Sequence, residues 1–225
     1  MYNTRPGLLI GFHGCDKSRQ QHLLQGPAII PLSKEPFDWL GHGMYFWENN
    51  YDRALQWAES KKSKGRIDEA AVIGAVLDLS YCCDLLDSKF ISMLARYYRL
   101  LEIEYSALKK EIPSNKDYPC DPHGDKLMRF RDCATIEFMH KKIREQVRMD
   151  LISKGYTGYK IFDSVRGMFS EGGPAYEGAG FHVKSHIQMC IRNSNCIKGF
   201  FIKREEIDFV KKETEPKTFE YRIEQ

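Results

Sequence analysis

The stretch WLGHGMYFWENNYDRALQWA, residues 39–58, carries the most informative pattern of the chain. Its segment GMYFW, residues 43–47, is apolar and aromatic, a composition typical of a β-strand. Asparagine is a favoured residue at the start of a helix, and Asn50 precedes apolar residues at helical spacing. The stretch therefore predicts a strand that turns directly into a helix, which runs from Tyr51 to about Lys62.

The patterns on either side predict an α+β fold. Apolar runs predict further strands at 7–15, 70–79, 158–162, 186–192 and 199–204, and a short helix is predicted at 16–26. Apolar residues at helical spacing fill 84–111 and 132–153, with a loop rich in Pro and Asp between them at 113–125. We therefore expect one domain over residues 1–225, with a helical insertion or lid at about 84–153 between two halves of a sheet.

Composition narrows the class of protein. The chain has 225 residues and a net charge of +3, enough length for a buried core and too little charge to indicate a polyanion partner by itself. No apolar run reaches the roughly 18 residues that a membrane helix needs, and the N-terminus lacks the layout of a secretion signal. The seven cysteines show no CxxC pair, which favours reduced thiols. We expect a cytoplasmic protein that does not contact membranes.

One set of residues resembles a metal site in type but not in spacing. Cys120, His123, Cys133 and His140 are all possible zinc ligands. Structural zinc sites usually contain tight units such as C-x2-C or H-x3-H, and neither unit occurs in this set. We therefore expect no metal.

Three motifs together resemble a known enzyme family. The chain has Phe-His-Gly-Cys at 12–15, Gly-His-Gly-Met-Tyr-Phe at 41–46, and Gln188 within a late strand that follows a glycine-rich loop. This order is similar to that of the ADP-ribosyltransferase fold, in its poly(ADP-ribose) polymerase-like and diphtheria-toxin-like branch. The resemblance covers residues 7–60 and 158–204, and it implies a split β-sheet core of two small packed sheets around an NAD cleft.

The resemblance implies a role for each motif residue. His13 would hydrogen-bond a ribose hydroxyl of NAD, and the backbone of Gly14 would meet the nicotinamide amide. Tyr45 would stack on the nicotinamide ring, which is held well as a flat cation. Trp57 would supply a second stacking aromatic ring. NAD is then the substrate, and the segment around Tyr45 forms the floor and wall of a nicotinamide pocket.

Gln188 departs from the family, which has a catalytic glutamate at this point. Strand alternation places Gln188 on the face opposite Met189, so Gln188 should point into the cleft. Its amide can accept the proton of a ribose hydroxyl, but it lacks the charge of a carboxylate. Two readings stay open: Gln188 is the third catalytic residue beside His13 and Tyr45, or Glu171 or Glu177 supplies the carboxylate. The missing glutamate argues for transfer of a single ADP-ribose and against polymer elongation.

The glycine-rich loop at 166–180 would recognise the acceptor. Its candidate acceptor-binding residues are Arg166, Phe169, Glu171, Tyr176 and Glu177. Their aromatic and charged side chains suit an RNA or DNA base with its phosphate, or a protein side chain. The chain is similar in general character to bacterial toxin-type transferases of toxin–antitoxin and antiphage systems, which implies an antitoxin or inhibitor protein as a partner. The alternative is a weakly active module that binds NAD or ADP-ribose, or an NAD glycohydrolase.

Overall fold

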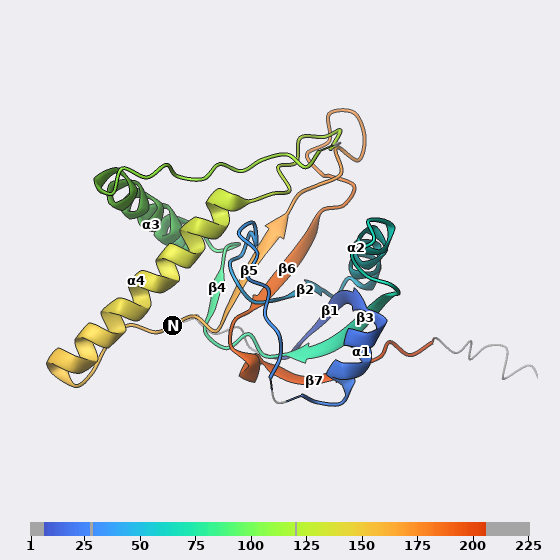
Figure 1. Cartoon of the computed structure of the whole chain (residues 1–225), viewed down its shortest axis with the longest axis horizontal. Helices are drawn as coiled ribbons and strands as arrows, with labels where there is room; N and C mark the ends of the chain where they lie inside the picture. The colour runs from blue at the N-terminus through green and yellow to red at the C-terminus, as the bar shows by residue number, and fades with distance from the viewer. Residues whose placement is uncertain (1–6, 28, 120, 206–225) are drawn as a thin grey trace, which may run out of the picture.

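The protein folds into one sheet with helices on both of its halves. The computed structural model describes residues 7–27, 29–119 and 121–205. Its elements in chain order are β1 (Leu9–Asp16), α1 (Lys17–Leu24), β2 (Met44–Glu48), α2 (Tyr51–Ser63), β3 (Ala70–Leu77), β4 (Cys82–Asp84), α3 (Ser88–Ala107), α4 (Phe130–Lys154), β5 (Ser164–Phe169), β6 (His186–Ile191), the 3-10 turn η1 (Ser194–Cys196) and β7 (Ile197–Phe201) (Figure 1). The predicted α+β class is confirmed.

The ladder between β1 and β2 is the shortest in the sheet of the described residues. The strand order of the sheet is β4-β5-β6-β2-β1-β3-β7, and all neighbours are antiparallel except β4 and β5. Strand β1 pairs with β3 from Leu9 to Asp16, but its ladder with β2 holds only the pairs Gly11↔Glu48 and Phe12↔Trp47 among the described residues. We expected two separate small sheets, and that expectation is wrong. This short ladder joins the two halves into one sheet, and beyond Phe12 no residue of β1 pairs with β2 within the described chain.

Helices α3 and α4 form a packed layer on one half of the sheet. Together with β4, β5 and β6 they bury a core that includes Phe90, Ile136, Met139 and Val165. Figure 1 shows this pair beside β4 and β5, whereas α1 and α2 lie beside β1 and β3. The helical segment that we expected as an insertion or a lid thus packs against β4, β5 and β6.

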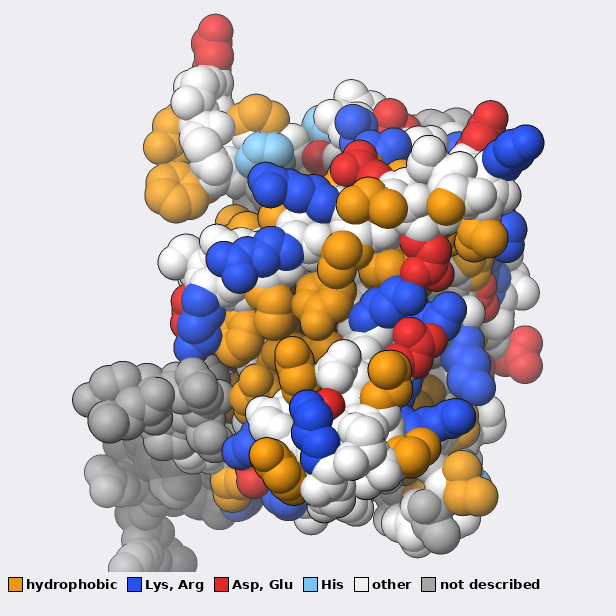
Figure 2. Space-filling model, turned by 90° about the vertical axis from the view of Figure 1, so that its left-hand side faces the viewer, with side chains coloured by type: hydrophobic (Ala, Val, Ile, Leu, Met, Phe, Trp, Pro, Cys, Tyr) orange, Lys and Arg blue, Asp and Glu red, His pale blue; other side chains and the backbone are white. Residues whose placement is uncertain are grey.

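The outer face of this helical layer is mixed in character. Figure 2 shows apolar side chains there, interspersed with Lys and Arg. The exposed apolar residues of the two helices are Ile91, Leu100, Ile103, Met149, Leu151 and Ile152. In the part of the chain that the structure describes, no helix is long and apolar enough to cross a membrane.

Two expectations about the strands were wrong. The segment 158–162, predicted as a strand, has no regular structure, and the strand that follows α4 is β5, at Ser164–Phe169. Arg166 and Gly167 inside β5 hid its apolar alternation, so we assigned residues 166–169 to the glycine-rich loop. The short strand β4 was missed as well.

Candidate functional site

A cleft of about 1000 Å³ opens where β1 and β2 lose their pairing. Its walls come from both halves of the sheet, from α2 and from the loops around residues 31–39 and 183–186. His13, Gly14, Tyr45, Trp57 and Gln188, five residues singled out from the sequence, all line it. The sheet topology thus brings together motifs that are far apart in the chain.

The sequence around β2 folds as its pattern indicated. Strand β2 ends at Glu48, and α2 begins at Tyr51 after Asn50, whose side chain accepts a hydrogen bond from the backbone N–H of Arg53 at 3.1 Å. The predicted asparagine cap is therefore confirmed. This tight strand-to-helix turn sets α2 along the cleft.

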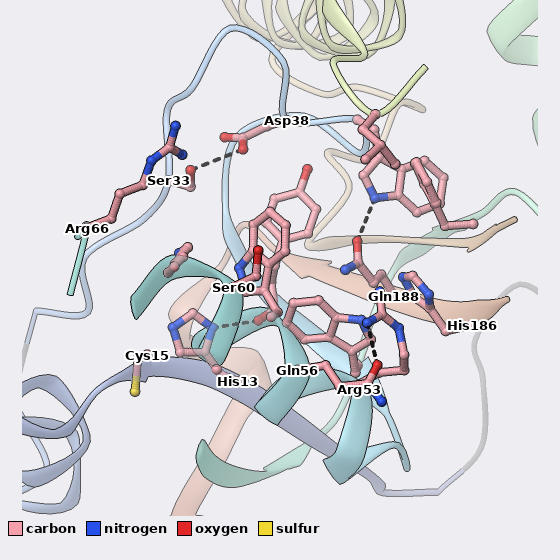
Figure 3. A pocket seen from close by; sticks show the side chains of 18 of the residues that line it. His13, Cys15, Ser33, Asp38, Arg53, Gln56, Ser60, Arg66, His186 and Gln188 are labelled. Carbon is pink, nitrogen blue, oxygen red and sulfur yellow. Dashed lines mark hydrogen bonds between the residues drawn. The ribbon is translucent and has the colours of Figure 1, made fainter. Parts of the chain in front are cut away.

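His13 bridges the opening between β1 and β2. Its Nδ1 lies 2.8 Å from the backbone oxygen of Tyr45 (Figure 3). Because a carbonyl oxygen only accepts, Nδ1 carries the proton, and the neutral ring presents Nε2 as an acceptor. Burial lowers the pKa of His13 to about 4, so the ring is neutral at pH 7. This tautomer suits a bond from a ligand hydroxyl.

The structure explains why residue 14 is a glycine, which the sequence did not reveal. A Cβ at this position would lie 2.1 Å from the backbone oxygen of Ala54 in α2. Such a contact is impossible without moving the helix, so the glycine allows α2 to pack closely on β1. We had explained Gly14 by close approach of a ligand, and helix packing accounts for it without one.

The ring of Tyr45 is held in a fixed position. Its hydroxyl donates to the backbone oxygen of Gly41 at 2.8 Å and accepts from the backbone N–H of Leu40 at 2.9 Å. Burial raises the pKa of this hydroxyl well above its usual value, so it remains protonated. Tyr45 also lines the cleft, so a rigid aromatic ring is available there for stacking.

Gln188 points into the cleft, as strand alternation predicted. It is 8% exposed and lines the cleft, whereas its neighbour Met189 lies in the core behind β6. Its Oε1 accepts a hydrogen bond from Nε1 of Trp39 at 2.6 Å (Figure 3). The oxygen we expected to accept from a ribose therefore already has a donor.

Glu171 lines the cleft close to Arg53 and His186. Its carboxylate pairs with the guanidinium of Arg53, and both side chains are largely buried. The same carboxylate lies 3.9 Å from Nδ1 of His186, which donates to the backbone oxygen of Lys184 at 2.7 Å. Burial lowers the pKa of His186 to about 4, so its ring is neutral at pH 7. We call Trp39, Arg53, Glu171, His186 and Gln188 the glutamine end of the cleft.

The opposite end of the cleft is positively charged. Arg19, Lys61, Lys64 and Arg66 line it, and we call them the basic end. Asp16 and Glu59 line the cleft as well, yet within the described chain no carboxylate forms an ion pair with these four cations. Burial lowers the pKa of Lys61, and the charge of Arg19 acts in the same direction. Figure 3 places Arg66 and Gln188 at opposite sides of the cleft.

Three predicted acceptor-binding residues lie away from the cleft lining. Arg166 is 4% exposed and forms ion pairs with Glu48 and Asp84. Its charge is thus used inside the fold, and we drop it from the acceptor site. Tyr176 and Glu177 are exposed on the loop and do not line the cleft. Phe169 does line the cleft, as the last residue of β5, with its ring stacked on that of His186.

Several cleft residues escaped the sequence analysis. These are Arg19, Asp38, Trp39, Arg53, Lys61 and His186. Arg53 and Lys61 lie a little more than two helical turns apart on α2. This spacing, visible in the sequence, indicates that they share a side of the helix. Asp38 had no such signal, and burial raises the pKa of its carboxyl to about 6.

Metal ligation finds no support in the described chain. No group of three or more His, Cys, Asp or Glu residues there could hold an ion. His140 is buried on α4 and His123 is exposed, while Cys120 lies outside the described residues.

Comparison with known proteins identifies no relative: no model of a protein family matches the sequence, and no curated protein or solved structure matches the chain.

Proposed function

We propose that this protein binds NAD in the cleft and transfers one ADP-ribose to a macromolecule. The observation that carries the proposal is the convergence of His13, Tyr45 and Gln188 on one cleft, at the place where β1 and β2 separate. The order and types of these residues are those that resemble the ADP-ribosyltransferase family, with glutamine in place of its glutamate.

Two parts of the cleft suit two parts of NAD. The basic end offers cations without carboxylate partners in the described chain, which suits a pyrophosphate. The ring of Tyr45 suits the flat, positively charged nicotinamide, and Nε2 of His13 suits a ribose hydroxyl.

The reaction would proceed by displacement at the ribose carbon C1′. The bond from C1′ to the nicotinamide nitrogen breaks, its electron pair stays on that nitrogen, and neutral nicotinamide leaves. A lone pair of the acceptor then forms the new bond to C1′, and the acceptor loses a proton. Glu171 is the carboxylate at the glutamine end that could stabilise the cationic ribose and take this proton.

The acceptor would approach from the side of the loop that carries Glu171. Phe169 lines the cleft there, and Arg129 lies with its guanidinium 4.7 Å from the centre of the Phe169 ring. Because Phe169 is 6% exposed and its ring is stacked on that of His186, it forms part of the cleft wall. The preference for RNA over a protein side chain as the acceptor rests on the likeness to toxin-type transferases.

A catalytically weak NAD-binding module or an NAD glycohydrolase is the second candidate. The absence of a carboxylate at Gln188 is the observation that favours it, because one charge about 5 Å from the cationic ribose is worth roughly 3 kcal/mol at an effective dielectric of about 20. That energy corresponds to about a hundredfold in rate.

The test uses NAD labelled in its adenylate part, together with cell extract. We expect nicotinamide release and transfer of label to a macromolecule, with the label removed by ribonuclease and retained after protease. Release without transfer would mean a glycohydrolase, and NAD binding by calorimetry without release would mean a binding module. If NAD does not bind at all, the cleft has another ligand and the proposal fails.

A further inference from the structure

The contact between Trp39 and Gln188 fixes which end of the amide faces the cleft. The two atoms lie 2.6 Å apart, and the residues are 149 positions apart in the chain. An indole N–H can only donate, so the amide atom that it meets must be the oxygen. The amide nitrogen of Gln188 therefore points elsewhere.

The amide nitrogen is turned toward the cleft. Gln188 lines the cleft, and Figure 3 shows its nitrogen on the side away from the hydrogen bond to Trp39. No described residue accepts a hydrogen bond from this NH2 group. A side chain that is only 8% exposed thus presents two N–H bonds to whatever occupies the cleft.

The position of Trp39 is itself built by its surroundings. Its ring meets the ring of Phe169 edge to face at 5.0 Å. A Cβ at Gly167 would lie 2.9 Å from Cη2 of Trp39, and Gly167 is the β5 residue directly paired with Gln188. The glycine therefore leaves the space that the indole fills. The backbone of Leu40, the next residue, is held by the hydroxyl of Tyr45.

We propose that Trp39 is a positioning residue that holds the NH2 group of Gln188 toward the substrate, so that Gln188 donates a hydrogen bond where the enzymes that the sequence resembles accept one. This inference rests on the proposed function. A carboxylate bonds a ribose hydroxyl more strongly as positive charge develops on the sugar, whereas an N–H donor to the hydroxyl oxygen does not. Gln188 then positions bound NAD, and the negative charge for the reaction comes from Glu171.

The first experiment follows the indole N–H of Trp39 by nuclear magnetic resonance. We expect a strongly downfield proton signal that moves upfield in Gln188→Leu. In Gln188→Glu the signal should move further downfield, and it should titrate with the new carboxyl group. An indole signal that is the same in all three proteins would overturn the proposal, whether or not NAD binds.

Adding NAD to the wild-type protein tests the donor role of Gln188 separately from the proposed function. We expect the side-chain NH2 signals of Gln188 to shift on saturation. If NAD shifts signals of His13 and Tyr45 but leaves the Gln188 amide unmoved, the donor role is wrong while the NAD site stands. If NAD shifts no signal in the cleft, the proposed function fails, and the indole measurements still report on Trp39.

A double-mutant cycle then asks whether Trp39 acts through Gln188. Trp39→Phe keeps the aromatic contact with Phe169 and removes the N–H donor, and we expect about a fivefold weaker affinity for NAD, the effect of one hydrogen bond. In the Gln188→Leu background the same change should cost nothing further. Gly167→Ala, which displaces the indole, should follow the same pattern. Equal losses in both backgrounds would make Trp39 a packing residue only.

Discussion

The two ends of the cleft manage charge in opposite ways. At the basic end, four cations line the cleft and the described chain supplies no carboxylate to pair with them. At the glutamine end, Arg53 is paired with Glu171. Oε1 of Gln188 and Nδ1 of His186 each have a hydrogen-bond partner. The basic end can therefore attract an anion, whereas the glutamine end holds its groups in fixed directions.

Because the two ends differ in this way, we expect substitutions at each end to affect a different property of the protein. Unpaired cations near solvent act mainly on affinity, and salt weakens them. Fixed dipoles and a buried ion pair act on the orientation and stabilisation of a reacting group, because they need little reorganisation. Changes at the basic end should thus alter NAD binding, whereas loss of the Glu171 carboxylate at the glutamine end should alter turnover.

The largest expected effect is at Glu171. Glu171→Gln removes the carboxylate and keeps the shape of the side chain, so nicotinamide release should fall by about a hundredfold, with NAD affinity changed by less than about threefold. Single-turnover release at saturating NAD measures the first, and calorimetry the second. Glu177→Gln, in the same loop but exposed and away from the cleft, is the matched control and should keep full activity. A fully active Glu171→Gln protein would remove Glu171 from the reaction.

A smaller effect is expected when Lys61 on α2 is replaced, and its neighbour Lys62 provides the control. Lys61 lines the cleft and Lys62 does not. Lys61→Gln should weaken NAD binding by about tenfold at low salt, close to the value of one charge-assisted hydrogen bond, and the deficit should shrink as salt rises. Lys62→Gln should leave the affinity unchanged. Equal effects of the two changes would mean that the basic end acts by overall charge and holds no phosphate directly.

The smallest effect is expected at His140, which does not line the cleft. His140 is a residue of α4 and is 1% exposed, and neither nitrogen of its ring has a hydrogen-bond partner among the described residues. His140→Leu should stabilise the fold at pH 7 by about 1 kcal/mol, which raises the melting temperature by about 2–4 °C. His22→Leu, at an exposed position of α1, should change it little.

Acid should enlarge the difference between wild type and His140→Leu. Burial lowers the pKa of His140 from 6.5 to about 3, so between these values the unfolded chain binds a proton that the folded chain excludes. Wild-type stability should therefore be fully present above pH 6.5 and fall as the pH drops toward 3. His140→Leu should fall less steeply, with His13 and His186 leaving a remaining slope. If stability depends on pH equally in the two proteins, the ring of His140 has a hydrogen-bond partner in solution and the prediction is wrong.

The sequence by itself determined the local elements that border the cleft. Alternation in β6 placed Gln188 opposite Met189, and the asparagine cap marked the start of α2. These features depend on residues a few positions apart, whose spacing and backbone preferences can be read along the chain. The helical spacing of 84–111 and 132–153 likewise predicted α3 and α4.

Only the tertiary structure decided which polar groups meet. Arg53 is paired with Glu171 across 118 residues, Trp39 donates to Gln188 across 149, and the charge of Arg166 is turned inward to Glu48 and Asp84. A side chain's partner depends on which strands the fold makes neighbours, and β4 and β5 could not be predicted from local pattern. Burial then sets the charge of each group, as it does for His13, because the cost of removing a charge from water depends on the surrounding structure and not on neighbouring residues in the sequence.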